Sequence, residues 1–171
     1  MVLSLDDIKK EVDMDKDRGD KEKKFKNESM LKYEFIKALE QEFSESLCNK
    51  YIRANWLIPA LDETIRTGRP DIRISNLVIE VEPPAANLEV GREQLMQYMR
   101  ELYEEAGKRV KVYGLVTNGS IAELWEYDKN DPKQIRSGSM PDVVRDAIER
   151  FCSQEKIPVI NAEDLIRLVG V

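Results

Sequence analysis

The stretch RTGRPDIRISNLVIEVEPP, residues 66–84, carries the main signal for the fold. It contains two runs rich in Ile, Leu and Val, residues 71–74 and 77–82, and the turn-forming pair Ser75 and Asn76 lies between them. Two β-rich runs joined by two such residues are typical of a β-hairpin. The two prolines that follow end the second strand, because proline cannot donate a hydrogen bond to a sheet. The stretch therefore predicts a hairpin.

Three acids interrupt this apolar hairpin: Asp71, Glu80 and Glu82. Side chains of a strand alternate between the two faces, so Glu80 and Glu82 point to the same face. If Asp71 on the paired strand converges with them, the three carboxylates form an oxygen-rich pocket that suits a hard divalent cation. The simpler alternative is a solvated face, since exposed carboxylates are the default on protein surfaces.

The same patterns extend outward from the hairpin along the chain. The expected elements, in order, are a helix over 27–47 that continues past a kink at Pro59 to about residue 64, strands over 71–74 and 77–82, a helix over 87–107, strands over 109–117 and 121–128, a polar loop over 129–140, a helix over 140–154, a short strand over 157–160 and a helix over 161–170. This order, αββαββαβα, predicts an α/β protein with a central mixed sheet flanked by helices.

Length and composition predict one domain with a flexible leading segment. A chain of 171 residues is long enough for one domain with a real core and short for two. Residues 1–26 are dominated by charged side chains, which cannot bury enough surface to offset the entropy of ordering. We therefore expect a mobile or marginally helical tail over 1–26 and a single domain over 27–171.

Charge and residue usage limit the possible locations and cofactors. The net charge of −6 and the lack of a long apolar run exclude membrane insertion, and the early acids exclude a secretory signal, so we expect a cytoplasmic protein. The chain has no His and only two distant Cys, so any bound metal must sit on oxygen ligands, as Mg²⁺ or Mn²⁺ does. The acidic balance argues only weakly against nucleic acid, because charge can be segregated and residues 107–114 are locally basic.

Two helices carry polar side chains that the hairpin acids could meet. On the helix over 27–47, Glu28 falls on the same face as Leu31 and Phe35, taking about 100° per residue. On the helix over 87–107, Gln94 and Tyr98 are four residues apart at the edge of the apolar stripe, so both can lean over the end of the sheet. These positions could complete a site around the three acids.

The ordered set of these residues resembles the PD-(D/E)xK nuclease superfamily. The segments GRPDIRI and LVIEVE are similar to its Pro-Asp, hydrophobic strand and acid-x-Lys signature, and QLMQY is similar to the Gln-x-x-x-Tyr helix motif of its RecB and lambda-exonuclease-like branches. The segment GLVTNGSIAELWEY is similar to a strand pair found in some restriction-modification subunits. The resemblance covers about residues 28–127 and implies a restriction-endonuclease-like core.

The resemblance also implies roles for individual residues. It implies that Asp71 and Glu80 bind Mg²⁺ or Mn²⁺, with the backbone carbonyl of Val81 completing the ligands and Glu28 assisting. Gln94 and Tyr98 would position the substrate or the active centre. The implied chemistry is attack of a metal-activated water on a phosphodiester.

One position departs from the family pattern, because Glu82 stands where the signature has Lys. A second carboxylate could accept the proton of the water or hold a second metal, as Glu does in some restriction enzymes of the superfamily. Alternatively, the domain has lost catalysis and kept the fold. A third option is a basic residue that has moved elsewhere, with Arg92 and Arg100 as candidates.

The resulting hypothesis is a divalent-metal-dependent nuclease that hydrolyses phosphodiester bonds, with DNA as the expected substrate in restriction, repair or defence. The residues themselves do not distinguish DNA from RNA. Arg69, Arg73 and Arg92 are candidates for phosphate contacts, or are simply solvated or paired with nearby acids. The alternatives are an impaired nuclease fold that binds nucleic acid or protein, and an unrelated domain with an acidic face. A homodimer is compatible with each.

Overall fold

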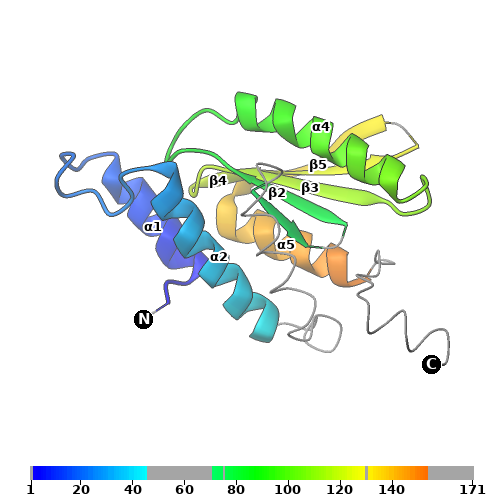
Figure 1. The fold of residues 1–171 in the computed structure, drawn as a ribbon. Coiled ribbons are helices and arrows are strands. Elements are labelled where there is room, and N and C mark those ends of the chain that lie inside the picture. The colour runs from blue at the N-terminus through cyan, green and yellow to red at the C-terminus, as the bar shows by residue number, and fades with distance from the viewer. Residues whose placement is uncertain (1, 46–70, 75, 130, 154–171) are drawn as a thin grey trace, which may run out of the picture.

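A computed structural model describes residues 2–45, 71–74, 76–129 and 131–153 of the chain. Over these residues a mixed β-sheet has helices against both of its faces (Figure 1). The elements are α1 (Leu5–Asp15), α2 (Glu28–Glu45), β1 (Ile72–Ile74), β2 (Leu77–Val81), α4 (Glu89–Glu105), β3 (Val112–Thr117), β4 (Ile121–Asp128), β5 (Asp131–Ser139) and α5 (Met140–Ser153). The expected α/β class with a mixed sheet flanked by helices is confirmed.

The sheet of the described residues has the strand order β1-β2-β3-β4-β5. β2 and β3 run parallel, whereas the other three neighbouring pairs are antiparallel. A parallel pair needs a long crossover, and α4 supplies it between β2 and β3. In the β1–β2 pair, Ile74 lies opposite Leu77, so a two-residue connection joins the strands and the predicted hairpin is confirmed.

Two separate apolar cores lie on the two faces of the sheet. α4 covers one face, where its Leu95 and Met99 pack with Val78 and Val116. α1, α2 and α5 cover the opposite face (Figure 1), where the strands contribute Leu77, Ile79, Val81, Leu115 and Leu124. The residues of β2 thus alternate between the two cores, as the strand pattern predicts.

The expected mobile or marginally helical tail over residues 1–26 is wrong, because this segment contains helix α1, whose apolar side chains are part of the core. Ser4 caps the helix: its side chain accepts the backbone N–H of Asp7, and the Asp7 side chain accepts that of Ser4. Leu5, Ile8 and Val12 are fully buried in the core shared with α2 and α5. Burying such side chains stabilises by roughly 1.5–3 kcal/mol each, which offsets part of the cost of ordering the highly charged segment.

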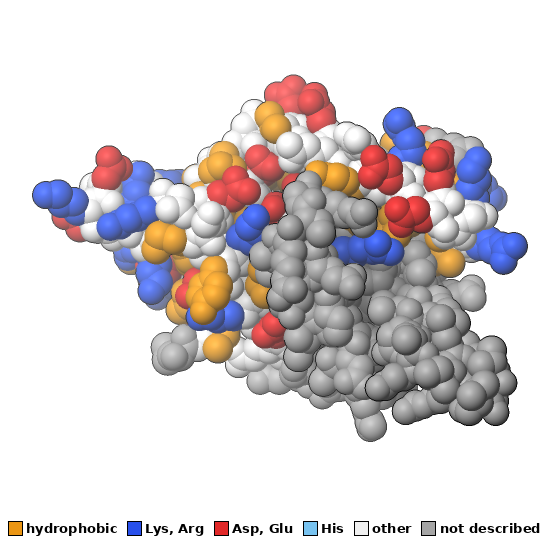
Figure 2. All heavy atoms as spheres, in the orientation of Figure 1, with side chains coloured by type: hydrophobic (Ala, Val, Ile, Leu, Met, Phe, Trp, Pro, Cys, Tyr) orange, Lys and Arg blue, Asp and Glu red, His pale blue; other side chains and the backbone are white. Residues whose placement is uncertain are grey.

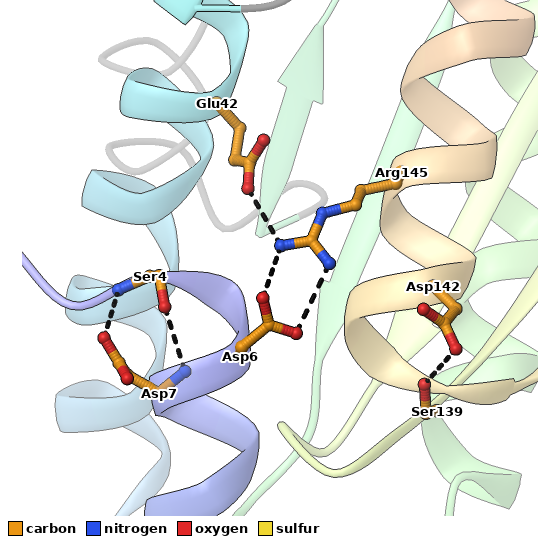
Figure 3. A network of polar contacts seen from close by, with 7 residues as sticks. All are labelled: Ser4, Asp6, Asp7, Glu42, Ser139, Asp142 and Arg145. Atoms are coloured by element: carbon orange, nitrogen blue, oxygen red, sulfur yellow. Dashed lines mark hydrogen bonds and ion pairs between the residues drawn. The ribbon is translucent and has the colours of Figure 1, made fainter.

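Polar contacts join α1 to α2 and α5, and others fix the segment that connects α1 to α2. Arg145 of α5 forms ion pairs with Asp6 of α1 at 2.8 Å and with Glu42 of α2 at 3.1 Å (Figure 3). Asp15, at the end of α1, is buried and accepts the backbone N–H groups of Lys24 and Phe25. The chain therefore turns back sharply between the two helices.

The expected polar loop over residues 129–140 is also wrong, since residues 131–139 form strand β5 along β4. Most side chains of β5 are exposed, and only Ile135 packs against the core from this strand. An edge strand without an apolar face lacks the alternation by which strands are predicted. The helix expected to continue to about residue 64, the strand over 157–160 and the helix over 161–170 lie outside the described residues.

Candidate functional site

The hairpin register brings Asp71 and Glu80 together. Ile72 pairs with Ile79, so continuing the antiparallel register by one residue places Asp71 opposite Glu80. The backbone N–H of Asp71 donates to Glu80 Oε1 at 3.2 Å. Asp71 Oδ2 in turn accepts the backbone N–H of Val81 at 2.8 Å. The two acids and Val81 are therefore joined at the edge of the sheet, as the predicted convergence requires.

A lysine from α2 completes this cluster. Lys32 Nζ donates to Asp71 Oδ1 at 2.7 Å, and the side chains of Lys32 and Asp71 are 28% and 15% exposed. Burial by itself lowers the pKa of Lys32, but the hydrogen bond to Asp71 and the charges of Asp71, Glu28 and Glu80 outweigh it and raise the pKa. Lys32 is thus a protonated, partly enclosed cation rather than a neutral amine nucleophile.

Glu80 is the most enclosed acid of the site. Only 4% of the residue is exposed. Burial, followed by the charge of Asp71, raises the pKa of Glu80 to about 8. Both causes act in the same direction, since desolvation and a neighbouring negative charge each disfavour the ionised carboxylate. Near neutral pH the side chain therefore binds a proton, unless a cation takes its place.

Glu28 and Glu82 lie at the rim of the same cluster. Burial and the charge of Asp71 raise the pKa of Glu28. Burial and then the charges of Glu28 and Asp71 raise the pKa of Glu82. Glu28 is the first residue of α2 and stands one turn before Lys32. Asp71, Glu28 and Glu80 thus act on the charge of Lys32, and Glu82 lies within electrostatic reach of Glu28 and Asp71, so negative charge is in excess among the described residues of the cluster.

Gln94 and Tyr98, the two residues of the helix motif, differ in whether they lie near the acidic cluster. Burial and the charges of Glu80 and Asp71 raise the pKa of Tyr98, which places its phenol within electrostatic reach of the pair. Gln94 is exposed and makes no hydrogen bond to the site acids among the described residues. The structure thus brings Tyr98 to the cluster and leaves Gln94 outside it.

Two of the three predicted arginines pair with acids outside the cluster. Arg92 binds Glu123 through Nε at 2.7 Å and Nη2 at 2.6 Å, in a groove of about 370 Å³ that Lys16 and Asn118 also line. Arg73 forms an ion pair with Glu105 at 3.9 Å. Arg69 lies outside the described residues. The bidentate pair with Glu123 explains why Arg92 is unavailable to the hairpin acids.

Lys32 is the functional candidate that sequence reasoning missed. A signal for it existed, because Lys32 follows Glu28 by four residues and so occupies the same face of α2. Arg92 and Arg100 were considered as the displaced basic residue, yet the cation that contacts Asp71 comes from the other side of the hairpin. Arg100 is exposed on α4.

The donor set has the chemistry of a site for a hard divalent cation. Asp71 and Glu80 offer carboxylate oxygens, which are the preferred ligands of Mg²⁺ and Mn²⁺, and a cation between them would relieve their mutual repulsion. As the described residues stand, no group of three or more Cys, Asp or Glu side chains is arranged closely enough to hold a metal ion. Two acids therefore fit the metal, whereas Glu28 and Glu82 remain at the rim.

Charged side chains of both signs are unevenly distributed on the face shown in Figure 2. In the face shown in Figure 2, Lys and Arg side chains gather over the loop between α1 and α2 and beyond the C-terminal end of α4, and acidic side chains lie between them. The loop contributes the lysines of the segment KDRGDKEKKFK, residues 16–26.

Comparisons with known proteins assign no relative to this chain. No family model, curated protein or solved structure matches it. None of the helices in the described part of the chain is both long and apolar enough to cross a membrane. Any functional assignment therefore rests on the geometry and chemistry of the site.

Proposed function

We propose that this chain is a divalent-metal-dependent nuclease that hydrolyses phosphodiester bonds in DNA, with a restriction-endonuclease-like core and a role in restriction, repair or defence. The observation that carries the proposal is the Asp71–Glu80 pair at the end of the hairpin, held against the cation Lys32. Buried acids with shifted pKa values cluster at functional sites, because folding alone gains nothing from their repulsion.

A bound metal ion would neutralise the repulsion between Asp71 and Glu80. Asp71 and Glu80 would hold Mg²⁺ or Mn²⁺, and the carbonyl of Val81 would complete the ligands from the protein. Glu80 is nearly enclosed, with a pKa of about 8, so the apo protein carries an acid that a cation would stabilise in its ionised form. The bound ion would act as a Lewis acid that activates water and stabilises charge on phosphate oxygens.

In the proposed enzyme, Lys32 supplies the positive charge that the signature lysine would provide at the position of Glu82. The family signature has a lysine two residues after the second acid, where this chain has Glu82. Lys32 Nζ lies 2.7 Å from Asp71 Oδ1 and supplies a positive charge beside the same pair. In the proposed enzyme, Lys32 orients the attacking water and offsets phosphate charge, and Glu82 accepts a proton at the rim.

Tyr98 and Glu28 have supporting roles in the proposal. Tyr98 reaches the pair from α4, and its raised pKa keeps the phenol protonated as a hydrogen-bond donor to a phosphate oxygen. Glu28 adds negative charge at the start of α2, beside Lys32. Gln94 and the arginines Arg69, Arg73 and Arg92 remain candidates for contacts with more distant parts of the substrate.

The test is cleavage of single- and double-stranded DNA by the purified protein in Mg²⁺ or Mn²⁺. We expect cleavage that chelation abolishes and that Asp71→Ala and Glu80→Ala reduce to background. Glu93→Ala removes an exposed acid of α4 outside the cluster and serves as the matched control. Cleavage that persists in both site variants would assign the activity to another part of the protein or to a contaminant.

A second candidate is an impaired nuclease fold that binds nucleic acid or protein without turnover. It is favoured by Glu82 in place of Lys and by Asp71, whose two oxygens already accept hydrogen bonds from Lys32 and Val81. This candidate predicts binding that is insensitive to Asp71→Ala and Glu80→Ala. Product that accumulates over several turnovers would exclude it.

A further inference from the structure

Gly91 lies in the first turn of α4, directly beneath Glu82. The helix begins at Glu89 after Leu88, and Gly91 is buried. A Cβ atom at position 91 would lie 2.7 Å from Cδ and 2.8 Å from Cγ of Glu82, with Oε1 closer still. These separations are shorter than real Cβ contacts allow. Any side chain larger than hydrogen at position 91 would displace Glu82.

The contact with Glu82 accounts for the glycine at this position. The backbone conformation does not require glycine, because Gly91 is not among the residues with positive φ. The three nearest atoms to the added Cβ all belong to Glu82. Glycine inside a helix is less favourable than alanine, since it loses more conformational freedom on folding. The site, rather than the helix, therefore explains Gly91.

The Glu82 side chain lies at the first turn of α4, where burial and the charges of Glu28 and Asp71 raise its pKa. The N-cap of α4, Leu88, provides no side-chain hydrogen bond to the helix. The positive end of the helix dipole attracts negative charge at this turn. Among the described residues, no cation forms an ion pair with Glu82. The packing against α4 is therefore the contact that holds this side chain.

We propose that Gly91 is a positioning residue for the candidate site: it lets the Glu82 side chain lie against the first turn of α4, which sets its carboxylate at the rim beside Glu28 and Asp71. This inference rests on the proposed function. An alanine at position 91 forces the carboxylate out of this place, so the rim beside the Asp71–Glu80 pair loses a carboxylate held in a defined position.

The test combines Gly91→Ala with changes at Glu82 in a double-mutant cycle. In the wild-type background we expect Gly91→Ala to weaken Mn²⁺ binding by about tenfold, the size of effect seen when a residue that orients a ligand is lost. In the Glu82→Ala background, Gly91→Ala has no effect on Mn²⁺ binding and leaves the melting temperature unchanged or higher, because alanine favours the helix. Val90→Ala, in the same turn and exposed, is the matched control.

A shorter acid provides a rescue. Glu82→Asp removes one methylene group, so its carboxylate can lie beside the methyl group that Gly91→Ala introduces without the close contact. We expect Mn²⁺ binding by the double variant that carries both Glu82→Asp and Gly91→Ala to exceed that of Gly91→Ala alone. A purely structural role of Gly91 would change the melting temperature without this rescue of metal binding.

The outcomes separate this inference from the proposed nuclease. If the wild-type protein binds Mn²⁺ and Gly91→Ala has the same effect with and without Glu82, the positioning role is overturned and the metal site stands. If wild type binds no Mn²⁺ by calorimetry, the proposed function fails, and the positioning role falls with it. Loss of Mn²⁺ binding in Gly91→Ala that vanishes in the Glu82→Ala background supports the inference.

Discussion

Two charge clusters in this molecule are built in opposite ways. In the helix network of Figure 3, Arg145 binds Asp6 and Glu42 near the surface. The hydrogen bond from Arg145 holds the pKa of Asp6 below its ordinary value. At the hairpin, the nearly enclosed Glu80 faces Asp71, and its pKa is raised to about 8. The first cluster stabilises the ionised form of Asp6, and the second destabilises the ionised form of Glu80.

This difference separates a structural contact from a functional candidate. The Arg145 network joins α1, α2 and α5 and has an obvious role in holding those helices together. The hairpin cluster lowers the stability of the apo protein, because its acids repel one another in a poorly hydrated place. A cation at Asp71 and Glu80 would reverse that cost, which is the physical basis of the proposed metal site.

The largest effect is expected from removing the cation of the hairpin cluster. Lys32→Met removes the cation that pairs with Asp71 and should destabilise the protein by roughly 2–3 kcal/mol, somewhat less than for a fully buried pair because Lys32 is partly exposed. Nuclease activity should fall to background. Urea unfolding and DNA cleavage measure the two effects.

Lys37→Met on the same helix is the control for Lys32. Lys37 lies over the ring of Tyr33 at 4.1 Å, away from the hairpin acids. We expect it to change stability by less than about 1 kcal/mol. Equal effects of the two substitutions on stability would show that the contact of Lys32 with Asp71 does not stabilise the protein.

The next largest effect is expected in the pH dependence of the protein's stability. The pKa of Glu80 is about 8 in the folded protein and ordinarily 4.5, so between these values the folded state binds more protons than the unfolded state. The stability of the metal-free protein should therefore fall as pH rises from about 4.5 to about 8. Glu80→Gln should remove this slope and stabilise the protein at pH 8.5 by about 2 kcal/mol or more. Urea unfolding at pH 5.5 and 8.5 measures it.

Glu93→Gln serves as the control in the pH experiment, since Glu93 is exposed on α4. Its pH dependence should match that of the wild type. A wild-type protein that becomes more stable between pH 5.5 and 8.5, with Glu80→Gln following the same curve, contradicts the enclosed, repelled state of Glu80.

A smaller effect is expected at the helix network. Arg145→Met removes both ion pairs and should cost about 1 kcal/mol, because partly exposed pairs contribute little each. The loss should shrink in 1 M salt (about 3 Å Debye length), which screens exposed charges. Unfolding at low and high salt tests this, and a salt-independent loss would indicate that Arg145 acts through packing of its aliphatic stem instead.

The smallest effect is expected at the cap of α1. Ser4→Ala removes the acceptor for the Asp7 backbone N–H and should destabilise the protein by about 1 kcal/mol. Hydrogen exchange of the α1 amides measures whether the helix frays from this end. Unchanged protection across α1 would mean that burial of Leu5 and Ile8, rather than the cap, fixes the start of the helix.

Local patterns in the sequence predicted part of this architecture. The hairpin was predictable because alternation and a two-residue turn both depend on near neighbours. The edge strand β5 was not, since its exposed side chains carry no apolar alternation. The sequence predicts at most a marginal helix at α1, because the high charge of the segment obscures the apolar spacing of Leu5, Ile8 and Val12.

The candidate site likewise contains some contacts that the sequence predicts and others that it does not. The pairing of Asp71 with Glu80 follows from register, which the sequence predicts once the turn is located. The contact of Lys32 with Asp71 depends on how α2 packs against the hairpin, 39 residues away in the chain. The partner of Arg92 likewise lies on a distant strand, at Glu123. Long-range packing decides these contacts, and the spacing of Lys32 four residues after Glu28 indicates only that the two side chains share a face of α2.

The most direct test of the central claim is a crystal structure of the protein soaked in Mn²⁺, with anomalous scattering used to locate the ion. We predict an anomalous peak between the carboxylates of Asp71 and Glu80, which disappears in Glu80→Gln crystals grown and soaked in the same way. A soaked wild-type crystal with Asp71 still bound to Lys32 and no peak at the pair would contradict a metal-dependent site at this hairpin.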